Sequence, residues 1–259
     1  MIRPSDFANW QEYYFTYQNI LAKQYLIPML EQWGVSIDGK KILEIGCGSG
    51  GVIEAFGERA SKAVGVELNP FDYTKLNTPK VQYVTADIYD PSHRERYADK
   101  YDIILFRDVI EHLPKKKEAF EICDTLLSEN GVIFITFPPY HGPYGAHQQV
   151  FSKTFLGRLP YTHLLPNSLY IKYVKAVEKG NDAALQVAHE LIASQTTIGS
   201  LKKSIRASAF KIDRYDYYLV RPSYEIRYGK KPRKINLMKY LPFIREFFVL
   251  GMYMIMRRK

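Results

Sequence analysis

The stretch 42–51 constrains the fold of this chain more than any other. An apolar run that includes Glu44 breaks at residue 46 into a glycine-rich segment, and the residues after it suit a helix. This order predicts a strand, a tight turn and the start of a helix in quick succession. Glycine lets the backbone turn sharply and approach a ligand without an intervening Cβ. We therefore expect a nucleotide-like ligand to lie across this turn.

The glycine spacing alone is compatible with two kinds of cofactor. Gly46, Gly48 and Gly51 satisfy the G-x-G-x-x-G dinucleotide fingerprint, whereas Gly46, Gly48 and Gly50 satisfy the G-x-G-x-G spacing of nucleoside-binding methyltransferases. A second apolar run ends at Glu67, about 20 residues downstream, where an acidic residue would bind ribose hydroxyls. Either family would place the acid there, so both cofactors remain open at this point.

Apolar runs suited to strands alternate with segments suited to helices over the middle of the chain. The expected strands are 41–45, 63–67, 81–85, 101–106 and 131–137. Such alternation predicts right-handed crossovers and a parallel sheet with helices on both faces. A ligand would then lie at the carboxyl ends of the strands.

The alternation stops after residue 140. We expect helices over 168–178 and 182–194 and therefore interpret 141–196 as an inserted helical cap on the substrate side. A helix near 197–208 leads to two last strands, 210–220 and 224–228. The short link between these strands permits only an antiparallel hairpin.

Residues 1–40 are expected to form a helical lid. Ser5 and Asp6 can cap a first helix, and Pro28 interrupts it. Most of its aromatic residues suit a stripe packed on the main domain, but Tyr13 and Tyr17 are candidates to reach over the cofactor or the substrate.

The composition favours one main globular domain in a reducing compartment. The chain has 259 residues, 46% of them hydrophobic, and its net charge is +9. Its two cysteines lie far apart and predict neither a disulfide framework nor a metal cluster. No apolar secretory segment and no run of about 18 uncharged apolar residues occurs. A cytoplasmic protein is therefore expected.

A series of motifs in fixed order resembles the class I S-adenosylmethionine-dependent methyltransferases, particularly the broad group of bacterial small-molecule methyltransferases. The resemblance covers about residues 41–137, and 210–228 resembles the family's terminal antiparallel strands. It implies an α/β, Rossmann-like, doubly wound and mostly parallel seven-stranded sheet with an antiparallel last strand. The motifs are Leu43-Glu44-Ile45-Gly46-Cys47-Gly48-Ser49-Gly50, Gly65-Val66-Glu67, Ala86-Asp87, Tyr101-Asp102-Ile103-Ile104, Val109-Ile110-Glu111-His112-Leu113 and Gly131-Val132-Ile133-Phe134-Ile135.

This resemblance implies that the cofactor is S-adenosylmethionine, bound by residues 41–140 and 197–229. Glu67 would bind the ribose hydroxyls, and Leu68 would pack on the adenine. Asp87 and Ile88 would bind the amino edge of the adenine. The residues implied to contact the methionine portion are Glu44, Gly46, Cys47, Gly48 and Gly50. Arg107 and Asp108 follow the fourth strand and would border the transferred methyl group.

Proton removal from a hydroxyl acceptor needs a base, whereas methyl transfer itself requires neither a covalent nucleophile nor a metal. The candidate catalytic residues are His147, His141 and Asp108. His147 precedes Phe151-Ser152, which resembles the position of a histidine that follows the fifth strand in related enzymes, whereas we interpret His112 as a fold signature. Histidine suits proton transfer near neutral pH.

Residues 230–259 are expected to form a basic and apolar tail. The apolar run 247–256 is too short to span a bilayer, but an apolar helix flanked by basic residues can lie in a membrane interface. Some methyltransferases of cell-envelope glycan pathways end similarly. This resemblance makes peripheral contact with the inner membrane face, through 241–259, one of the expected interactions. Packing of this helix on its own domain or in a homodimer is the alternative.

Taken together, the sequence predicts a methyltransferase acting at oxygen or nitrogen of a small-molecule or lipid-linked sugar acceptor. A NAD-dependent oxidoreductase and a non-catalytic cofactor-binding member are the alternatives. Nucleic acid is disfavoured as a partner because the segment after the fourth strand lacks the Asn/Asp-Pro-Pro-aromatic pattern. The identity of the methyl acceptor does not follow from the sequence.

Overall fold

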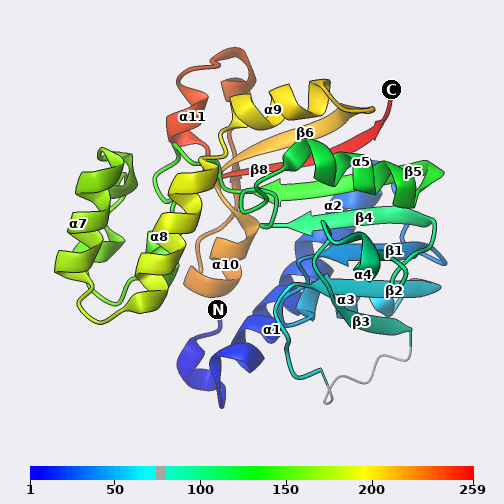
Figure 1. Cartoon of the computed structure of the whole chain (residues 1–259), viewed down its shortest axis with the longest axis horizontal. Helices are drawn as coiled ribbons and strands as arrows, with labels where there is room; N and C mark the ends of the chain where they lie inside the picture. The colour runs from blue at the N-terminus through cyan, green and yellow to red at the C-terminus, as the bar shows by residue number, and fades with distance from the viewer. Residues whose placement is uncertain (74–79) are drawn as a thin grey trace.

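The fold is that of a computed structural model in which residues 1–73 and 80–259 are described. Its centre is an eight-stranded sheet in the order β3-β2-β1-β4-β5-β8-β6-β7 (Figure 1). The strands are β1 (Lys41–Ile45), β2 (Lys62–Glu67), β3 (Val81–Thr85), β4 (Tyr101–Arg107), β5 (Leu127–Phe137), β6 (Phe210–Val220), β7 (Arg233–Lys234) and β8 (Gly251–Arg258). The predicted doubly wound, Rossmann-like sheet is confirmed, with the short edge strand β7 as an addition.

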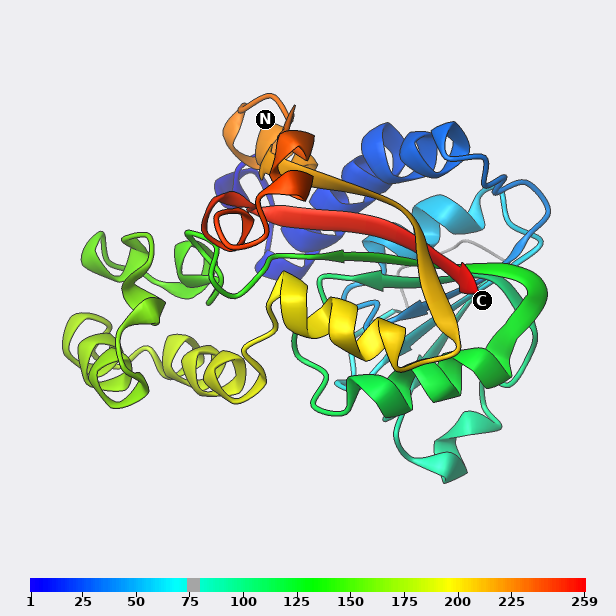
Figure 2. The same ribbon diagram turned by 90° about the horizontal axis from the view of Figure 1, so that it is seen from above.

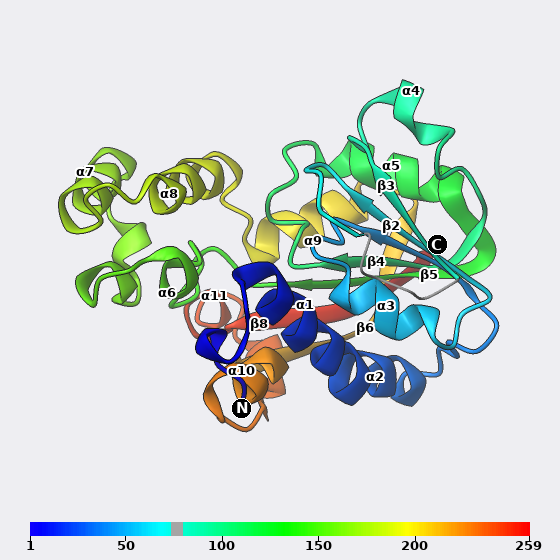
Figure 3. The same ribbon diagram turned by 90° about the horizontal axis from the view of Figure 1, so that it is seen from below.

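The first five strands are parallel, and helices cover both faces of the sheet (Figures 2 and 3). One face carries α1 (Trp10–Leu21), α2 (Ile27–Gln32) and α3 (Gly51–Gly57), and the other carries α4 (Pro91–Arg94), α5 (Lys116–Leu126) and α9 (Ile198–Arg206). Successive strand residues point to opposite faces, so Ile42 joins one buried core and Leu43 joins the other. This double burial explains the continuous apolar runs of the strands.

A helical segment follows β5 and projects beyond the carboxyl ends of the parallel strands (Figure 1). It contains α6 (Gln148–Phe151), α7 (Asn167–Val177) and α8 (Asp182–Ser194), with short 3₁₀ turns at Leu156–Arg158 and Thr162–Leu164. Its helices enclose a small core of their own, which includes Tyr170, Val174 and Leu191. The predicted helices are confirmed, whereas the role of this segment as a cap stays a prediction.

The prediction of a strand over 224–228 is wrong, because this segment is helical. Helix α10 spans Pro222–Tyr228, with Pro222 in its first turn and Gly229 ending it in a left-handed conformation (φ 66°). Proline suits the first turn of a helix and glycine suits its end. These two signals outweigh the aromatic residues that had suggested a strand.

The predicted apolar helix in the C-terminal tail is also wrong. Residues 251–258 form β8, which lies between β5 and β6 and is antiparallel to both. Periodicity cannot separate a short, fully buried apolar run in a helix from one in a strand. The antiparallel last strand implied by the resemblance is therefore β8. Because β8 belongs to the sheet, the prediction that 230–259 form a separate tail is wrong for residues 251–258. A 3₁₀ turn, Asn236–Tyr240, and α11 (Arg245–Phe248) precede β8.

The N-terminal helix begins later than predicted. Asn9 caps α1, its side chain accepting a hydrogen bond from the Glu12 N–H at 2.9 Å, whereas Ser5 and Asp6 belong to a separate 3₁₀ turn, Pro4–Asp6. A π-helical turn, Ala22–Leu26, joins α1 to α2 just before Pro28. Within the described ranges, no helix is both long enough and apolar enough to cross a bilayer.

Candidate active site

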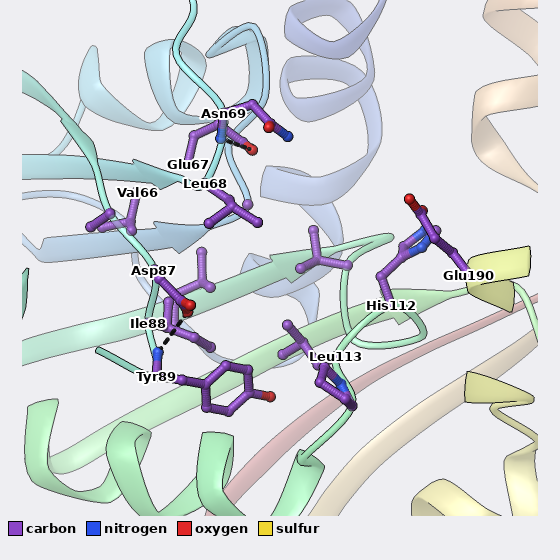
Figure 4. A pocket seen from close by; sticks show the side chains of 15 residues that line it. Val66, Glu67, Leu68, Asn69, Asp87, Ile88, Tyr89, His112, Leu113 and Glu190 are labelled. Atoms are coloured by element: carbon purple, nitrogen blue, oxygen red, sulfur yellow. Dashed lines mark hydrogen bonds between the residues drawn. The ribbon is translucent and has the colours of Figure 1, made fainter. Parts of the chain in front are cut away.

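A cavity of about 530 Å³ opens at the carboxyl ends of β1, β2 and β3 (Figure 4). Its size lies in the range of small-molecule and cofactor sites. Its lining comes from the strand ends, from the segment after β4, and from α8 through Glu190, which Figure 4 shows close to His112. The lining residues are Ile45, Gly46, Val66, Glu67, Leu68, Asn69, Ala86, Asp87, Ile88, Tyr89, Val109, His112, Leu113, Pro114 and Glu190.

Glu67 ties the glycine turn to the end of β2. One carboxylate oxygen accepts a hydrogen bond from the Gly48 N–H at 2.9 Å, and the other accepts from the Asn69 N–H at 3.1 Å. These two bonds fix the carboxylate at the edge of the cavity. Carboxylate oxygens have several acceptor positions, so capacity remains for hydroxyl donors of a ligand.

Asp87 and Ile88 line the same cavity after β3. The Asp87 carboxylate accepts a hydrogen bond from the Tyr89 N–H at 2.9 Å, which closes a local turn (Figure 4). Leu68 lies across the cavity on the β2 side, and 62% of its surface is exposed. An exposed leucine opposite a carboxylate suits a flat, polar-edged ring between them.

The glycines of the turn are needed for different reasons. Gly46, Gly48 and Gly50 all have positive φ angles, which L side chains adopt at a cost. A Cβ on Gly46 would lie 2.4 Å from a Val109 methyl group, whereas one on Gly48 would meet no atom within 4 Å. Gly46 is therefore required by packing within the fold, and Gly48 leaves open space beside the backbone.

Glu44 and Cys47 lie behind the turn and do not line the cavity. Both are buried. Burial raises the pKa of Glu44 to about 8, although Arg107 opposes this shift. Within the described residues, Oε2 of Glu44 has no hydrogen-bond partner. Contact of these two side chains with the methionine portion of a cofactor stays a prediction.

A second, smaller cavity of about 100 Å³ adjoins the first, and His112 lines both. Its walls come from α1, the end of β4, α6 and α10. The lining residues are Tyr14, Tyr17, Arg107, Asp108, His112, His147, Gln149, Val150, Phe151, Arg221, Ser223, Tyr224 and Arg227. Unlike the first cavity, this one is dominated by charged and phenolic side chains.

Asp108 anchors an ion-pair network in the smaller cavity. Its carboxylate accepts hydrogen bonds from Arg221 Nη2 at 2.5 and 2.6 Å and from the Thr136 hydroxyl at 3.0 Å. Arg107 Nη1 lies 3.4 Å from it. Burial raises the pKa of Asp108, but the two arginines outweigh burial and hold that pKa well below its usual range. Asp108 is therefore ionised, and its carboxylate already accepts hydrogen bonds from Arg221 and Thr136. Both facts argue against its predicted role as a proton acceptor.

His147 lines the smaller cavity and pairs with Glu111, a buried residue that lies beside that cavity. The His147 Nε2 atom lies 3.5 Å from Glu111 Oε1, and neither it nor either Glu111 carboxylate oxygen has a hydrogen-bond partner among the described residues. Burial lowers the pKa of His147 to about 4 and raises the pKa of Glu111 to about 7. His147 also has a left-handed backbone (φ 52°), as does Asp108 (φ 53°). Such backbone strain gathers at functional sites.

His112 completes a group of potential metal ligands with this pair. Its Nε2 atom lies 4.0 Å from Glu111 Oε1, and its ring stacks on that of His147 at 5.5 Å. The ligand atoms of Glu111, His112 and His147 all lie within 4.8 Å of one another. Two imidazoles and a carboxylate could hold a divalent cation.

The other predicted site residues lie at different distances from the two cavities. His141 stacks on Phe247 at 5.7 Å and lines neither cavity, and its role as an active-site base stays a prediction. Tyr17 lines the smaller cavity and accepts a hydrogen bond from Arg107 Nη2. Tyr13 lies behind this wall, where its hydroxyl accepts from Arg227 Nε at 3.2 Å. Both tyrosines are buried on α1.

The sequence analysis missed several residues of the smaller cavity. Arg221, Tyr224 and Arg227 lie on or beside α10, which had been predicted as a turn and a strand. Glu111 and His112 belong to a motif that was interpreted only as a fold signature. Glu111 gave a usable signal, because a carboxylate that follows a buried strand points to the ligand edge of a parallel sheet.

Comparison with known proteins decides the family. Residues 17–165, more than half of the chain, match the sequence model of a methyltransferase-domain family. The chain belongs to this family, the class I S-adenosylmethionine-dependent methyltransferases. The predicted family is thereby confirmed, and the NAD-dependent alternative left open by the glycine spacing is not supported.

This methyltransferase domain has curated relatives among the ubiquinone biosynthesis O-methyltransferases. It is 26% identical to the enzyme of Histophilus somni over 118 residues, which is 42% of this chain and 50% of that enzyme. It is 27% identical to the Escherichia coli enzyme over 104 residues, which is 38% of this chain and 42% of that enzyme. The chain thus spans about half the length of the curated relatives it matches.

Solved methyltransferase structures share the fold over almost the whole domain. A TehB-like S-adenosylmethionine-dependent methyltransferase from Corynebacterium glutamicum is 14% identical, with a TM-score of 0.51, covering 96% of this chain and 97% of that one. The plantazolicin methyltransferase BpumL, in complex with S-adenosylhomocysteine and a triazolic desmethylplantazolicin analogue, is 13% identical, with a TM-score of 0.55, covering 96% and 90%. At such identities the likeness establishes the fold alone.

Proposed function

We propose that this chain is an S-adenosylmethionine-dependent methyltransferase that acts on an oxygen atom of a small-molecule acceptor. The observation that carries the proposal is the junction of two unlike cavities at His112. The larger one has carboxylates at the ends of β2 and β3, and the smaller one holds His147, whose buried Nε2 atom has no hydrogen-bond partner among the described residues. A nucleoside cofactor and a hydroxyl acceptor would occupy these cavities side by side.

The residues of the larger cavity fit the cofactor. Glu67 would hold the ribose hydroxyls, Leu68 and Ile88 would enclose the adenine, and Asp87 would accept from its exocyclic amine. The open space beside Gly48 suits the close approach of the methionine portion. When bound, the cofactor supplies an electrophilic methyl group on a sulfonium.

We propose that His147 takes the proton from the acceptor hydroxyl. Because burial keeps its pKa at about 4, the imidazole is neutral at pH 7 and Nε2 can accept a hydrogen bond. A base of such low pKa holds a proton weakly, but the pKa of Glu111 is about 7 and its Oε1 lies 3.5 Å away. We propose that Glu111 orients His147 and stabilises the imidazolium that forms.

The deciding experiment is a screen of hydroxyl acceptors with methyl-labelled cofactor, followed by variants of the pair. His147→Ala should lower kcat by about 100-fold or more, since general bases contribute roughly 10² to 10⁴. It should leave the affinity for S-adenosylhomocysteine within about twofold, because His147 does not line the larger cavity. Glu111→Gln should lower kcat as well, while the exposed His189→Ala serves as the matched control.

Unchanged turnover in His147→Ala would remove this residue from the mechanism. A chelator provides the second arm, because Glu111, His112 and His147 could also hold a cation. If EDTA abolished turnover and an added divalent metal restored it, the three side chains would be acting as metal ligands. The proton-transfer proposal would then fall, while the methyltransferase proposal would stand.

We further propose that the domain contacts an anionic membrane surface through residues 237–248, which would suit a lipid-linked sugar acceptor. Lys239 and Arg245 accompany the apolar residues of this segment, and its one acid, Glu246, accepts hydrogen bonds from the N–H groups of residues 198 and 199. A basic segment with exposed apolar side chains binds such surfaces. The exposed apolar side chains are Leu237, Tyr240, Leu241, Phe243, Ile244, Phe247 and Phe248.

Co-sedimentation with phosphatidylglycerol vesicles tests this contact. The double variant Phe243→Ser/Phe248→Ser should partition less than the wild-type chain, whereas Leu169→Ser, an exposed change on α7, should not alter partitioning. Truncation is unsuitable because β8 follows the segment. Equal partitioning would contradict the proposal. If the double change instead converted a dimer into a monomer in sedimentation velocity, the segment would be a homodimer interface and the membrane contact would fall.

A further inference from the structure

The smaller cavity carries an excess of positive charge. Arg107, Arg221 and Arg227 all line it, and Asp108 is the one carboxylate among its described lining residues. Glu111 lies beside it and Glu44 behind Arg107, but burial raises the pKa of Glu44 to about 8, so that at pH 7 it is mostly neutral. Removing unpaired charges from water is costly unless an opposite charge accompanies them.

The charge of Asp108 is already committed to two of the three guanidinium groups. It receives two hydrogen bonds from Arg221, and Arg107 lies 3.4 Å from it. For Arg227, no carboxylate lies within 4.0 Å among the residues that the structure describes. Arg227 is therefore the guanidinium that lacks a counter-ion.

Aromatic side chains hold Arg227 in place. Its guanidinium carbon lies 5.3 Å from the Tyr17 ring centre and 5.2 Å from that of Tyr228, and Nε donates to the Tyr13 hydroxyl at 3.2 Å. These contacts order the group without neutralising it. Its Nη atoms form no hydrogen bond with the described part of the chain, and a guanidinium offers them as a planar fork that matches carboxylate and phosphate oxygens.

The cofactor does not supply the missing negative charge. S-adenosylmethionine has a zwitterionic amino-acid portion and a cationic sulfonium, so its binding adds a net positive charge beside the arginines. An anionic acceptor would balance both. Arg227 has no counter-ion among the described residues and lines the smaller cavity, where the acceptor would bind. From these two observations and the charge balance, we infer that the methyl acceptor carries a carboxylate or phosphate group, which Arg227 binds.

The size of the cavity agrees with this assignment. Its volume of about 100 Å³ is much smaller than the 530 Å³ of the larger cavity. This space has room for an oxyanion group. His147 lies in the same cavity, so an acceptor held by its anionic end at Arg227 would keep a hydroxyl within the site. The inference rests on the proposed function.

Calorimetric titration tests it without requiring turnover. The chain would first be saturated with S-adenosylhomocysteine and then titrated, at constant ionic strength, with benzoate, phenyl phosphate and the neutral benzamide. At least one of the two anions should bind about tenfold or more tightly than benzamide, which corresponds to one charge-assisted hydrogen-bonded pair. The stronger anion identifies the group as a carboxylate or a phosphate.

Variants assign the effect to Arg227. Arg227→Gln should weaken binding of that anion by about tenfold or more, and Arg227→Lys should recover part of the loss. Arg233→Gln on the exposed strand β7 removes the same charge elsewhere and should have no effect. Circular dichroism of each variant reports whether it is folded.

The outcomes separate this inference from the proposed function. If benzamide bound as tightly as both anions, or if neither anion bound, the inference would be overturned. It would also be overturned if Arg227→Gln weakened binding of S-adenosylhomocysteine but not of the anion, since the methionine carboxylate would then be the partner of Arg227. Failure of the wild-type chain to bind S-adenosylhomocysteine at all would instead reject the proposed function.

Discussion

At the scale of single residues, the glycine turn serves packing as much as ligand binding. The sequence suggested that glycines are needed so that a ligand can approach the backbone. The structure gives Gly46 a second reason, because a Cβ there would lie 2.4 Å from a Val109 methyl group. Gly48 has no such neighbour within 4 Å. The two positions should therefore respond differently to the same substitution.

We predict that Gly46→Ala destabilises the fold more than Gly48→Ala. Both changes place a side chain at positive φ, which costs about 1 to 2 kcal/mol, and Gly46→Ala adds overpacking of about 1 to 3 kcal/mol. The measurement is the free energy of unfolding in urea. Adding Val109→Ala should recover part of the loss for Gly46→Ala and none for Gly48→Ala. Equal destabilisation by the two glycine changes would contradict this account of the turn.

At the scale of elements, β8 is an internal strand of the sheet. It pairs with β5 on one side and β6 on the other, and residues 251–256 are buried. We predict that a chain ending at Leu250 loses cooperative thermal unfolding, because two strands lose their pairing partner and a buried apolar face is exposed. A chain lacking only Lys259 is the control. A cooperative transition in the shorter chain would show that β8 is dispensable.

The helical segment after β5 depends on one buried carboxylate. Glu178 accepts hydrogen bonds from the N–H groups of Lys153 and Thr154, from the Thr154 hydroxyl and from the Asn181 side chain, at 2.7 to 2.8 Å. Burial raises the pKa of Glu178, but these donors outweigh burial and lower it to about 2. The carboxylate thus joins α7 and α8 to the chain that precedes them.

We predict that Glu178→Gln destabilises the chain by about 2 kcal/mol at pH 7. Because the folded-state pKa lies below the unfolded value near 4.5, the ionised carboxylate stabilises the fold above pH 4.5, and this contribution is lost as the pH falls towards 2. The stability difference between the wild-type chain and the variant should therefore shrink over that interval. Glu190→Gln on α8 is the matched control. A difference independent of pH would contradict this role of Glu178.

At the scale of the whole molecule, the sequence predicted the parallel core because its signals are local. Strands such as 41–45 are mostly apolar and end at an acid or just before glycine, and both signals can be recognised in the sequence alone. The segments 224–228 and 251–258 carry no such local signal. Their states depend on which surfaces bury them, so the aromatic residues of 224–228 and the apolar run of 251–256 were assigned to the wrong element.

The candidate site divides in the same way. Glu67, Asp87 and the glycine turn follow predicted strands, so their gathering at one sheet edge could be foreseen. Arg221 and Arg227 reach the site from α10, more than 100 residues after Asp108, and no local pattern marks their approach. His141 and His147 lie in one loop. Only the packing of that loop shows that, of the two histidines, His147 lines the smaller cavity.

The central claim is that the larger cavity is an S-adenosylmethionine site with Glu67 at its ribose end. Calorimetric titration of the full chain with S-adenosylhomocysteine and with NAD tests it most directly. We predict saturable binding of S-adenosylhomocysteine, no binding of NAD, and a loss of about 3 kcal/mol, roughly 100-fold in affinity, in Glu67→Ala but not in the exposed control Glu95→Ala. Tight binding of NAD with no response to S-adenosylhomocysteine would contradict the account.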